Sequence, residues 1–120
     1  MTGVRLYGLA GCDATRRALR WLERAAVPVV LHDFRRDGLD AGRLDAWERA
    51  VGWERLLNRR GRTWRELPAG RREPLDRDRA LELMLAQPSL IKRPVLELAD
   101  GRVHVGFTPS DYEALSGRPT

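Results

Sequence analysis

The chain has 120 residues, of which 42% are hydrophobic and 32% are charged. This length and balance are typical of one globular domain with its own core, and no run of 18 or more apolar residues is present that could span a membrane. The formal net charge of +5 comes almost entirely from arginine, because Lys92 is the only lysine. With a single cysteine, Cys12, an internal disulfide is excluded.

The basic charge does not by itself indicate a nucleic-acid-binding protein. Arginines alternate with acidic residues in WLERA, DAWERA, WERLL and LDRDRALEL, which is typical of solvated helix faces with local salt bridges. We therefore expect a site for small anions rather than a nucleic-acid partner. The first residues, MTGVRLYG, do not resemble an export signal. Together with the unpaired cysteine, this predicts a cytoplasmic location without membrane contact.

The chain begins with a predicted strand, helix and strand. Val4 to Tyr7 is a short buried strand that Gly8 ends. A helix is expected from about Asp13 to Ala26, because its apolar residues fall on one face. These residues are Ala14, Ala18, Trp21, Leu22 and Ala25. Pro28 ends this helix and opens a second strand, PVVLHDF, over residues 28–34.

No strand is predicted between Arg35 and Pro88. The segment 39–51 is an amphipathic helix that Gly52 caps, and WERLLN and TWREL are predicted to form short helical turns. Another helix lies within residues 73–88, beginning near Asp76 or Asp78 and ending at Pro88. We therefore predict a helical insertion over about residues 38–88.

Strands return after the insertion. RPVLELA and RVHVGF flank Asp100-Gly101, which predicts a hairpin whose two turn residues both adopt positive φ. TPSDYEAL then predicts a final helix, with Thr108 as N-cap, Pro109 at the first helical position and Asp111 two positions later.

The predicted element order is β-α-β, a helical insertion, and β-β-α. A parallel pair of strands needs a crossover connection, and the helix after the first strand supplies it. This order predicts an α/β protein with a thioredoxin-like fold, built on a mixed four-stranded sheet as a single domain over residues 1–120.

Cys12 is predicted to lie in the first turn of the helix that begins near Asp13. Free backbone N–H groups and the helix dipole favour the thiolate there. Arg16 and Arg17 act in the same direction, whereas Asp13 opposes it. A thiolate is a nucleophile. The alternative is a cysteine that only fills space in the core, but Cys12 lies outside the apolar periodicity of the helix.

The other polar residues give weaker indications of a functional site than Cys12 does. His32 and His104 lie in separate strands without cysteine or carboxylate neighbours at metal-ligand spacing, so we expect no metal site. We also expect no bound cofactor. The segment KRP at 92–94 places two basic residues before a proline at the start of a strand. It either presents charge at the edge of a site, with an X-Pro bond that can be cis, or is an exposed basic pair at the end of a loop.

Four segments together resemble the arsenate reductase (ArsC)/Spx family. In chain order they are YGLAGCDATRRALRWL, LLNRRGRTWREL, LMLAQPSLIKRPVLEL and VGFTPSDYEAL. The resemblance extends over roughly residues 3–116, and the segments CDA, LNRRGRTWR and IKRP are most similar to the YffB-like branch. It implies a thioredoxin-like fold with a helical insertion.

The resemblance also implies roles for individual residues. Cys12 matches the nucleophilic cysteine of the family, and Pro94 matches the cis-proline of thioredoxin-like proteins. Three arginines match positions that bind an anion or glutathione: Arg16, Arg60 and Arg93. Arg59 is an alternative to Arg60, one register away. Paired guanidinium N–H donors suit a carboxylate or a tetrahedral oxyanion.

The activity implied by the resemblance is that of a glutathione-dependent thiol oxidoreductase, with glutathione as co-substrate. Glutathione-linked arsenate reductases have a third arginine just before the Pro-Ser pair of the last block. Here Phe107 and Thr108 occupy those positions, with Arg102 as a possible substitute, and this departure weakens the expectation of arsenate reduction. The alternative function is an Spx-type regulator that binds RNA polymerase without catalysis. Thr15 stands where a Cys-x-x-Cys motif would have its second cysteine.

Overall fold

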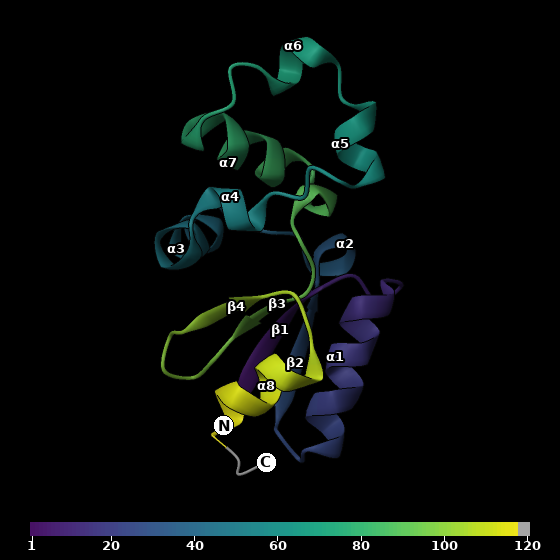
Figure 1. Cartoon of the computed structure of the whole chain (residues 1–120), viewed down its shortest axis with the longest axis vertical. Helices are drawn as coiled ribbons and strands as arrows, with labels where there is room; N and C mark the ends of the chain where they lie inside the picture. The colour runs from purple at the N-terminus through teal and green to yellow at the C-terminus, as the bar shows by residue number, and fades with distance from the viewer. Residues whose placement is uncertain (118–120) are drawn as a thin grey trace. The chain divides into compact units, whose positions relative to one another are not determined.

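A computed structural model describes residues 1–117 of the chain (Figure 1). It consists of two compact units. The sheet unit combines Met1–Gly38 with the chain from Arg93 onward, and the helical unit is Leu39–Lys92. The last positions of the predicted domain, 118–120, lie outside the described residues. Within residues 1–117, no helix combines the length and hydropathy that crossing a bilayer requires.

The sheet unit contains a mixed four-stranded sheet, as predicted. Its strands are β1 (Val4–Gly8), β2 (Val29–Asp33), β3 (Val95–Glu97) and β4 (Val103–Val105), in the spatial order β2-β1-β3-β4. β1 is parallel to β2 and antiparallel to β3, which pairs antiparallel with β4. The helix α1 (Asp13–Arg24) supplies the crossover between the parallel strands. This arrangement confirms the thioredoxin-like α/β fold expected from the element order.

One face of the sheet packs against α1 and the last helix, α8 (Pro109–Ser116). The two helices and the sheet contribute to a single buried cluster: Val4, Leu6, Ala18, Leu22, Ala25, Val27, Leu96, Leu98 and Tyr112. Alternate residues of a strand point to opposite faces, so Val4 and Leu6 reach this cluster together. The cluster holds the later turns of α1, through Ala18 and Leu22, against this face of the sheet.

α1 ends two residues before the predicted end at Ala26. Ala26 adopts a left-handed conformation, with φ of 58°. Its N–H donates to the Glu23 carbonyl at 3.0 Å, and the Val27 N–H donates to the Leu22 carbonyl at 3.0 Å. This hydrogen-bond pattern is a Schellman-type C-terminus with alanine in place of the usual glycine. The turn therefore ends the helix before Pro28 does.

β2 is shorter than the predicted strand 28–34, because a short helix that was not predicted follows it. This helix, α2, is Phe34–Asp37. The Asp33 carboxylate is its N-cap and accepts hydrogen bonds from the N–H groups of Arg35 at 2.7 Å and Arg36 at 3.2 Å. The aspartate therefore ends the strand and starts the helix, as an N-cap carboxylate does.

The helical unit consists of six short helices: α3 (Ala41–Val51), α4 (Trp53–Leu56), α5 (Arg62–Glu66), α6 (Ala69–Arg72), α7 (Arg77–Ala86) and the 3-10 turn η1 (Pro88–Leu90). Gly52, with φ of 87°, ends α3 as predicted, and the Asp76 carboxylate caps α7. α6 and η1 were not predicted. The insertion was predicted to end near Pro88, whereas the unit extends to Lys92.

The β3–β4 hairpin forms where it was predicted, but its turn differs. Gly101 has φ of 94°, whereas Asp100 does not adopt positive φ. The Gly101 N–H donates to the Leu98 carbonyl at 3.0 Å, and the Leu98 N–H donates to the Arg102 carbonyl at 2.9 Å. These bonds enclose a three-residue loop with glycine in its last position, so the predicted two-residue turn is wrong. The start of α8 is as predicted, with the Thr108 hydroxyl accepting from the Asp111 N–H at 3.0 Å.

Candidate functional site

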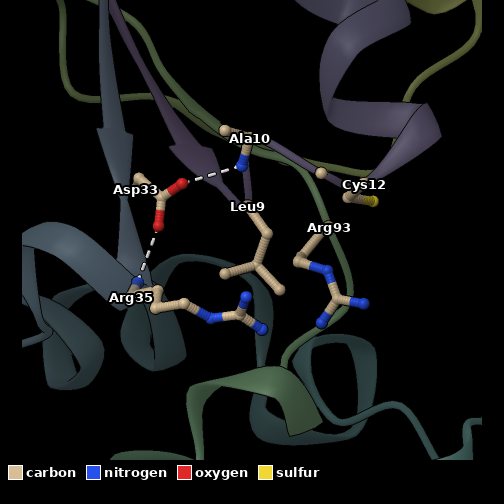
Figure 2. Close-up of a pocket in the computed structure, with 7 residues that line it drawn as sticks. Leu9, Ala10, Cys12, Asp33, Arg35 and Arg93 are labelled. Atoms are coloured by element: carbon tan, nitrogen blue, oxygen red, sulfur yellow. Dashed lines mark hydrogen bonds between the residues drawn. The ribbon is translucent and has the colours of Figure 1, made fainter.

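A pocket of about 440 Å³ lies at the edge of the sheet where β1 and β2 end. Its lining comes entirely from the sheet unit: Leu9, Ala10, Gly11, Cys12, Asp33, Arg35 and Arg93 (Figure 2). Its volume falls within the range typical of small-molecule sites. Because β1 and β2 are parallel, their carboxyl ends meet at this edge, which is where α/β sheets commonly bind ligands.

Cys12 is the N-cap residue of α1, as its predicted place at the start of the helix requires. Its backbone is extended, with φ of −82° and ψ of 127°. Its N–H donates to the Leu9 carbonyl at 2.9 Å, and its own carbonyl accepts the first helical hydrogen bond from Arg16 at 3.0 Å. The thiol is partly buried and lines the pocket. It is therefore outside the hydrophobic cluster and open to a reacting partner.

Opposing influences act on the Cys12 thiol. Partial burial alone raises its pKa, because desolvation disfavours the charged form. The nearby backbone N–H and hydroxyl of Thr15, together with the side chain and positive charge of Arg93, act in the other direction. The second group of influences prevails, so the pKa of Cys12 is lowered from its ordinary value. This shift favours the nucleophilic thiolate.

Thr15 was not predicted to belong to the site. The residue is only 1% exposed, and its hydroxyl has no hydrogen-bond partner within residues 1–117. It lies so close to the end of β1 that a Cβ on Gly8 would be 2.3 Å from the hydroxyl oxygen. Gly8 therefore does more than end the strand, because it leaves room for the threonine beneath the thiol. The signal available in the sequence was the spacing alone, a hydroxyl residue three positions after the cysteine.

Asp33 holds the loop that carries the thiol. One carboxylate oxygen accepts from the Ala10 N–H at 2.8 Å, while the other caps α2 (Figure 2). The side chain is 9% exposed. The Ala10 hydrogen bond, followed by those from Arg35 and Arg36, lowers the pKa of this carboxyl group. Asp33 thus fixes loop and helix to each other as an ionised carboxylate.

Two arginines line the pocket. Arg93, which the resemblance implied, acts on the Cys12 sulfur, and the peptide bond between Arg93 and Pro94 is cis. Arg35, at the second position of α2, was not predicted to contribute. Figure 2 shows the two side chains on either side of Leu9, with their guanidinium groups at the same end of the pocket. Two cations at one pocket are suited to anionic ligands.

The other implied arginines are not part of this pocket lining. Arg16 is exposed on α1. Arg17, next to it, stacks over the Phe107 ring at 5.6 Å. Arg59 and Arg60 are exposed in the helical unit, where the Arg60 N–H donates to the Asn58 side chain at 3.0 Å. Their roles in binding stay predictions.

The end of the sheet unit contains no arginine at the position where arsenate reductases have their third one. Phe107 packs edge-on against Tyr112, with ring centroids 4.7 Å apart. Arg102, the possible substitute, donates to Asp100 at 2.8 Å in the hairpin turn and is exposed. Its charge is offset locally, so it does not replace the missing arginine.

The two histidines make separate local contacts. His32 Nε2 is 2.7 Å from the Gly38 carbonyl oxygen, and His104 Nε2 is 3.4 Å from an Asp111 carboxylate oxygen. Across the described residues 1–117, no three histidine, cysteine, aspartate or glutamate side chains gather in an arrangement that could hold a metal ion.

The sequence and fold match those of known proteins. The model of the ArsC family matches residues 7–115. The chain belongs to the ArsC family. A relative from Haemophilus influenzae, an uncharacterised protein, is 40% identical over 111 residues, covering 92% of this chain and 96% of the relative.

Solved structures confirm the fold of this ArsC-family chain and its resemblance to the YffB-like branch. The structure of the YffB protein is 46% identical, with a TM-score of 0.88 and coverage of 92% of this chain and 96% of that one. An arsenate reductase-related protein from Brucella melitensis is 47% identical, with a TM-score of 0.76 and coverage of 97% and 96%. The fold is thus that of arsenate reductase-like thiol oxidoreductases.

Proposed function

We propose that this ArsC-family protein is a glutathione-dependent thiol oxidoreductase that uses Cys12 as its single redox-active group. The observation that carries the proposal is the partly buried thiol at the start of α1, whose pKa is lowered in a pocket lined by two arginines. Thiolates attack disulfides, and nearby cations favour partners that carry negative charge. The substrate class is a disulfide between glutathione and another thiol.

The reaction proceeds in two exchange steps. In the first, the Cys12 thiolate attacks the glutathionyl sulfur of the substrate. The Cys12–glutathione disulfide forms as the substrate disulfide breaks, and the released thiolate takes a proton from water. The chain has one cysteine, so no second protein thiol can break this intermediate. A second glutathione thiolate therefore attacks it, giving oxidised glutathione and the free Cys12 thiolate.

The site residues have different roles in these two steps. Thr15 and Arg93 favour ionised Cys12, both as the attacking group and as the group that leaves in the second step. Asp33 keeps the loop in place. Arg16 and Arg60 are proposed, from the family resemblance, to bind carboxylates of glutathione. Glutathione is a co-substrate rather than a resident cofactor, and the cytoplasm is the proposed location because glutathione is kept reduced there.

Disulfide exchange tests the proposal. The wild-type chain and Cys12→Ser are compared in the reduction of bis(2-hydroxyethyl) disulfide by glutathione, with intact mass spectrometry after exposure to oxidised glutathione. We expect turnover and one glutathionyl adduct in the wild type, and neither in the variant. We also expect iodoacetamide to modify native Cys12 faster than free cysteine at neutral pH. Alkylation no faster than free cysteine, without an adduct, would reject the proposal.

Two further measurements separate related activities. Arsenate, supplied with glutathione, should be a poorer substrate than the disulfide, because Phe107 and Thr108 rather than an arginine precede Pro109-Ser110 and Arg102 is paired with Asp100. An Spx-type regulator would retain RNA polymerase subunits in a pull-down equally well with wild type and Cys12→Ser. That result, without disulfide exchange, would favour the alternative.

A further inference from the structure

Arg35 and Arg36 are consecutive residues of α2 with different surroundings. The Arg36 guanidinium donates to both carboxylate oxygens of Asp37, at 2.6–3.0 Å, and to the Leu31 carbonyl at 3.0 Å. Within residues 1–117, the Arg35 guanidinium has no hydrogen bond or ion pair, although its backbone N–H is bound by Asp33. Arg36 is therefore neutralised by its neighbour, whereas Arg35 carries an uncompensated charge.

Arg35 is an exposed residue, and its uncompensated charge lies at the pocket. Arg35 lines the same pocket as Cys12, and Figure 2 shows its guanidinium at the end of the pocket to which Arg93 also extends. Arg36 does not line it. The Asp33 carboxylate anchors both the Arg35 backbone and the Ala10 N–H of the thiol loop. The base of the Arg35 side chain thus has a fixed position relative to the loop.

The charges around the pocket leave Arg35 without an anion of its own. Asp33 is the carboxylate in the lining, and its oxygens accept from the backbone N–H groups of Ala10, Arg35 and Arg36. Thr15 and Arg93 are the residues that lower the pKa of the Cys12 thiol most. A guanidinium at a pocket that is not itself paired with a protein anion is suited to a ligand carboxylate, which it binds through paired N–H donors.

We propose that Arg35 binds a carboxylate of the incoming thiol, so that the pocket selects thiols with a carboxylate remote from the sulfur over thiols without one. This inference rests on the proposed function. It assigns Arg35 to substrate recognition and Arg93 to the thiolate. Loss of Arg35 therefore weakens binding of an anionic thiol without changing the ionisation of Cys12.

Steady-state exchange with three thiols tests this assignment. The wild type, Arg35→Gln and the matched control Arg36→Gln are each supplied with glutathione, glutathione monoethyl ester (esterified at the glycine carboxylate) and cysteamine, which has no carboxylate. For Arg35→Gln we expect the KM for glutathione to rise roughly three- to tenfold, as for a charge-assisted contact partly screened by solvent. Its rate with cysteamine and the pH dependence of Cys12 alkylation should equal those of the wild type.

The outcomes separate the two proposals. Absence of glutathione exchange in the wild type would reject the proposed function and this inference with it. Exchange in the wild type, with the same KM in Arg35→Gln, would overturn only the role of Arg35. An equal rise in KM in Arg35→Gln and Arg36→Gln would overturn it too, since it would show a general effect of surface charge. A shifted alkylation profile in Arg35→Gln would assign Arg35 to the thiolate instead.

Discussion

Arginines in the two units have contrasting partners. In the helical unit, Arg77 of α7 donates to three carboxylates, those of Glu48 at 2.6 Å, Asp45 at 2.7 Å and Asp78 at 3.1 Å. In the sheet unit, Arg93 faces the Cys12 sulfur. Arg77 joins helices α3 and α7, and the acidic residues around it leave no charge for a ligand. Arg93 instead has a titratable thiol as its partner.

The comparison shows that arginine content does not locate a site in this chain. Lysine and arginine together number 22, and 17 acidic residues offset most of them. Many of the resulting pairs are exposed and local, such as Arg62 with Glu66 and Arg102 with Asp100. A cation acquires a functional role where its nearest anion is a reacting group or is supplied by a ligand. Predictions on Arg93, Thr15, Asp33 and Arg77 test this distinction.

Replacement of Arg93 has the largest expected effect. In Arg93→Gln, the thiolate loses a charged hydrogen-bond donor, so the pKa of Cys12 rises. We expect kcat/KM for glutathione exchange to fall roughly 10- to 100-fold, the range for loss of a charged hydrogen bond. The pH dependence of iodoacetamide alkylation should move to higher pH. An unchanged alkylation profile would remove Arg93 from the site.

Replacement of Thr15 has a smaller expected effect and separates function from stability. Thr15→Val keeps the shape of the buried side chain but removes the hydroxyl that favours the thiolate. We expect the pKa of Cys12 to rise and exchange at neutral pH to fall roughly two- to tenfold.

The thermal unfolding midpoint of Thr15→Val should not fall, because no hydrogen bond within residues 1–117 uses that buried hydroxyl. Thr15→Ser is the matched control, since it keeps the hydroxyl and should preserve the alkylation profile. Equal alkylation profiles in the valine and serine variants would show that the hydroxyl has no part in ionising Cys12.

The lowered pKa of Asp33 predicts how the stability of the sheet unit depends on pH. Backbone hydrogen bonds lower its pKa below the ordinary value of 3.8, and the Arg36 side chain lowers that of Asp37 to about 2. A carboxyl group whose pKa is lower in the folded state stabilises the fold above its unfolded pKa. The contribution is lost as the pH falls through the folded value.

We therefore expect the thermal unfolding midpoint to fall between pH 5 and pH 2, and Asp33→Asn to reduce this dependence. The asparagine amide also cannot reproduce all three backbone contacts of the carboxylate, so the variant should be less stable than the wild type at pH 5. Thermal unfolding followed by circular dichroism at several pH values measures both effects. Parallel pH profiles for the two proteins would contradict the role assigned to Asp33.

The sequence pattern predicted the sheet unit well where local signals agree. Period-two apolar strands, the crossover helix and the Thr108 cap all lie where they were predicted. The predictions of element boundaries failed where tertiary or side-chain contacts determine the local backbone conformation. Asp33 starts α2 within what reads as a strand, and Ala26 adopts a left-handed conformation that alanine rarely takes. Residue type alone predicts neither the start of α2 at this position nor the left-handed conformation of Ala26.

The candidate site was predicted in part for a related reason. Cys12 was found because a cysteine at the start of a helix is conspicuous, and Arg93 through the family resemblance. Thr15 reads as an ordinary residue of a helix rich in arginine, because its burial depends on the close approach of Gly8. Arg35 was missed because its exposed position in the charged segment FRRD gives no indication that only one of the two arginines is paired.

Arg77 supplies the smallest expected effect and the control for the whole comparison. In Arg77→Gln, two partly exposed ion pairs between α3 and α7 are lost, together with one ion pair within α7. Because solvent screens such pairs, we expect the unfolding midpoint to fall by less than about 3 °C. The KM for glutathione and the alkylation profile of Cys12 should equal those of the wild type, although the substitution removes the same charge as Arg93→Gln. A change in exchange comparable to that in Arg93→Gln would mean that overall positive charge, rather than a cation facing the thiol, sets reactivity.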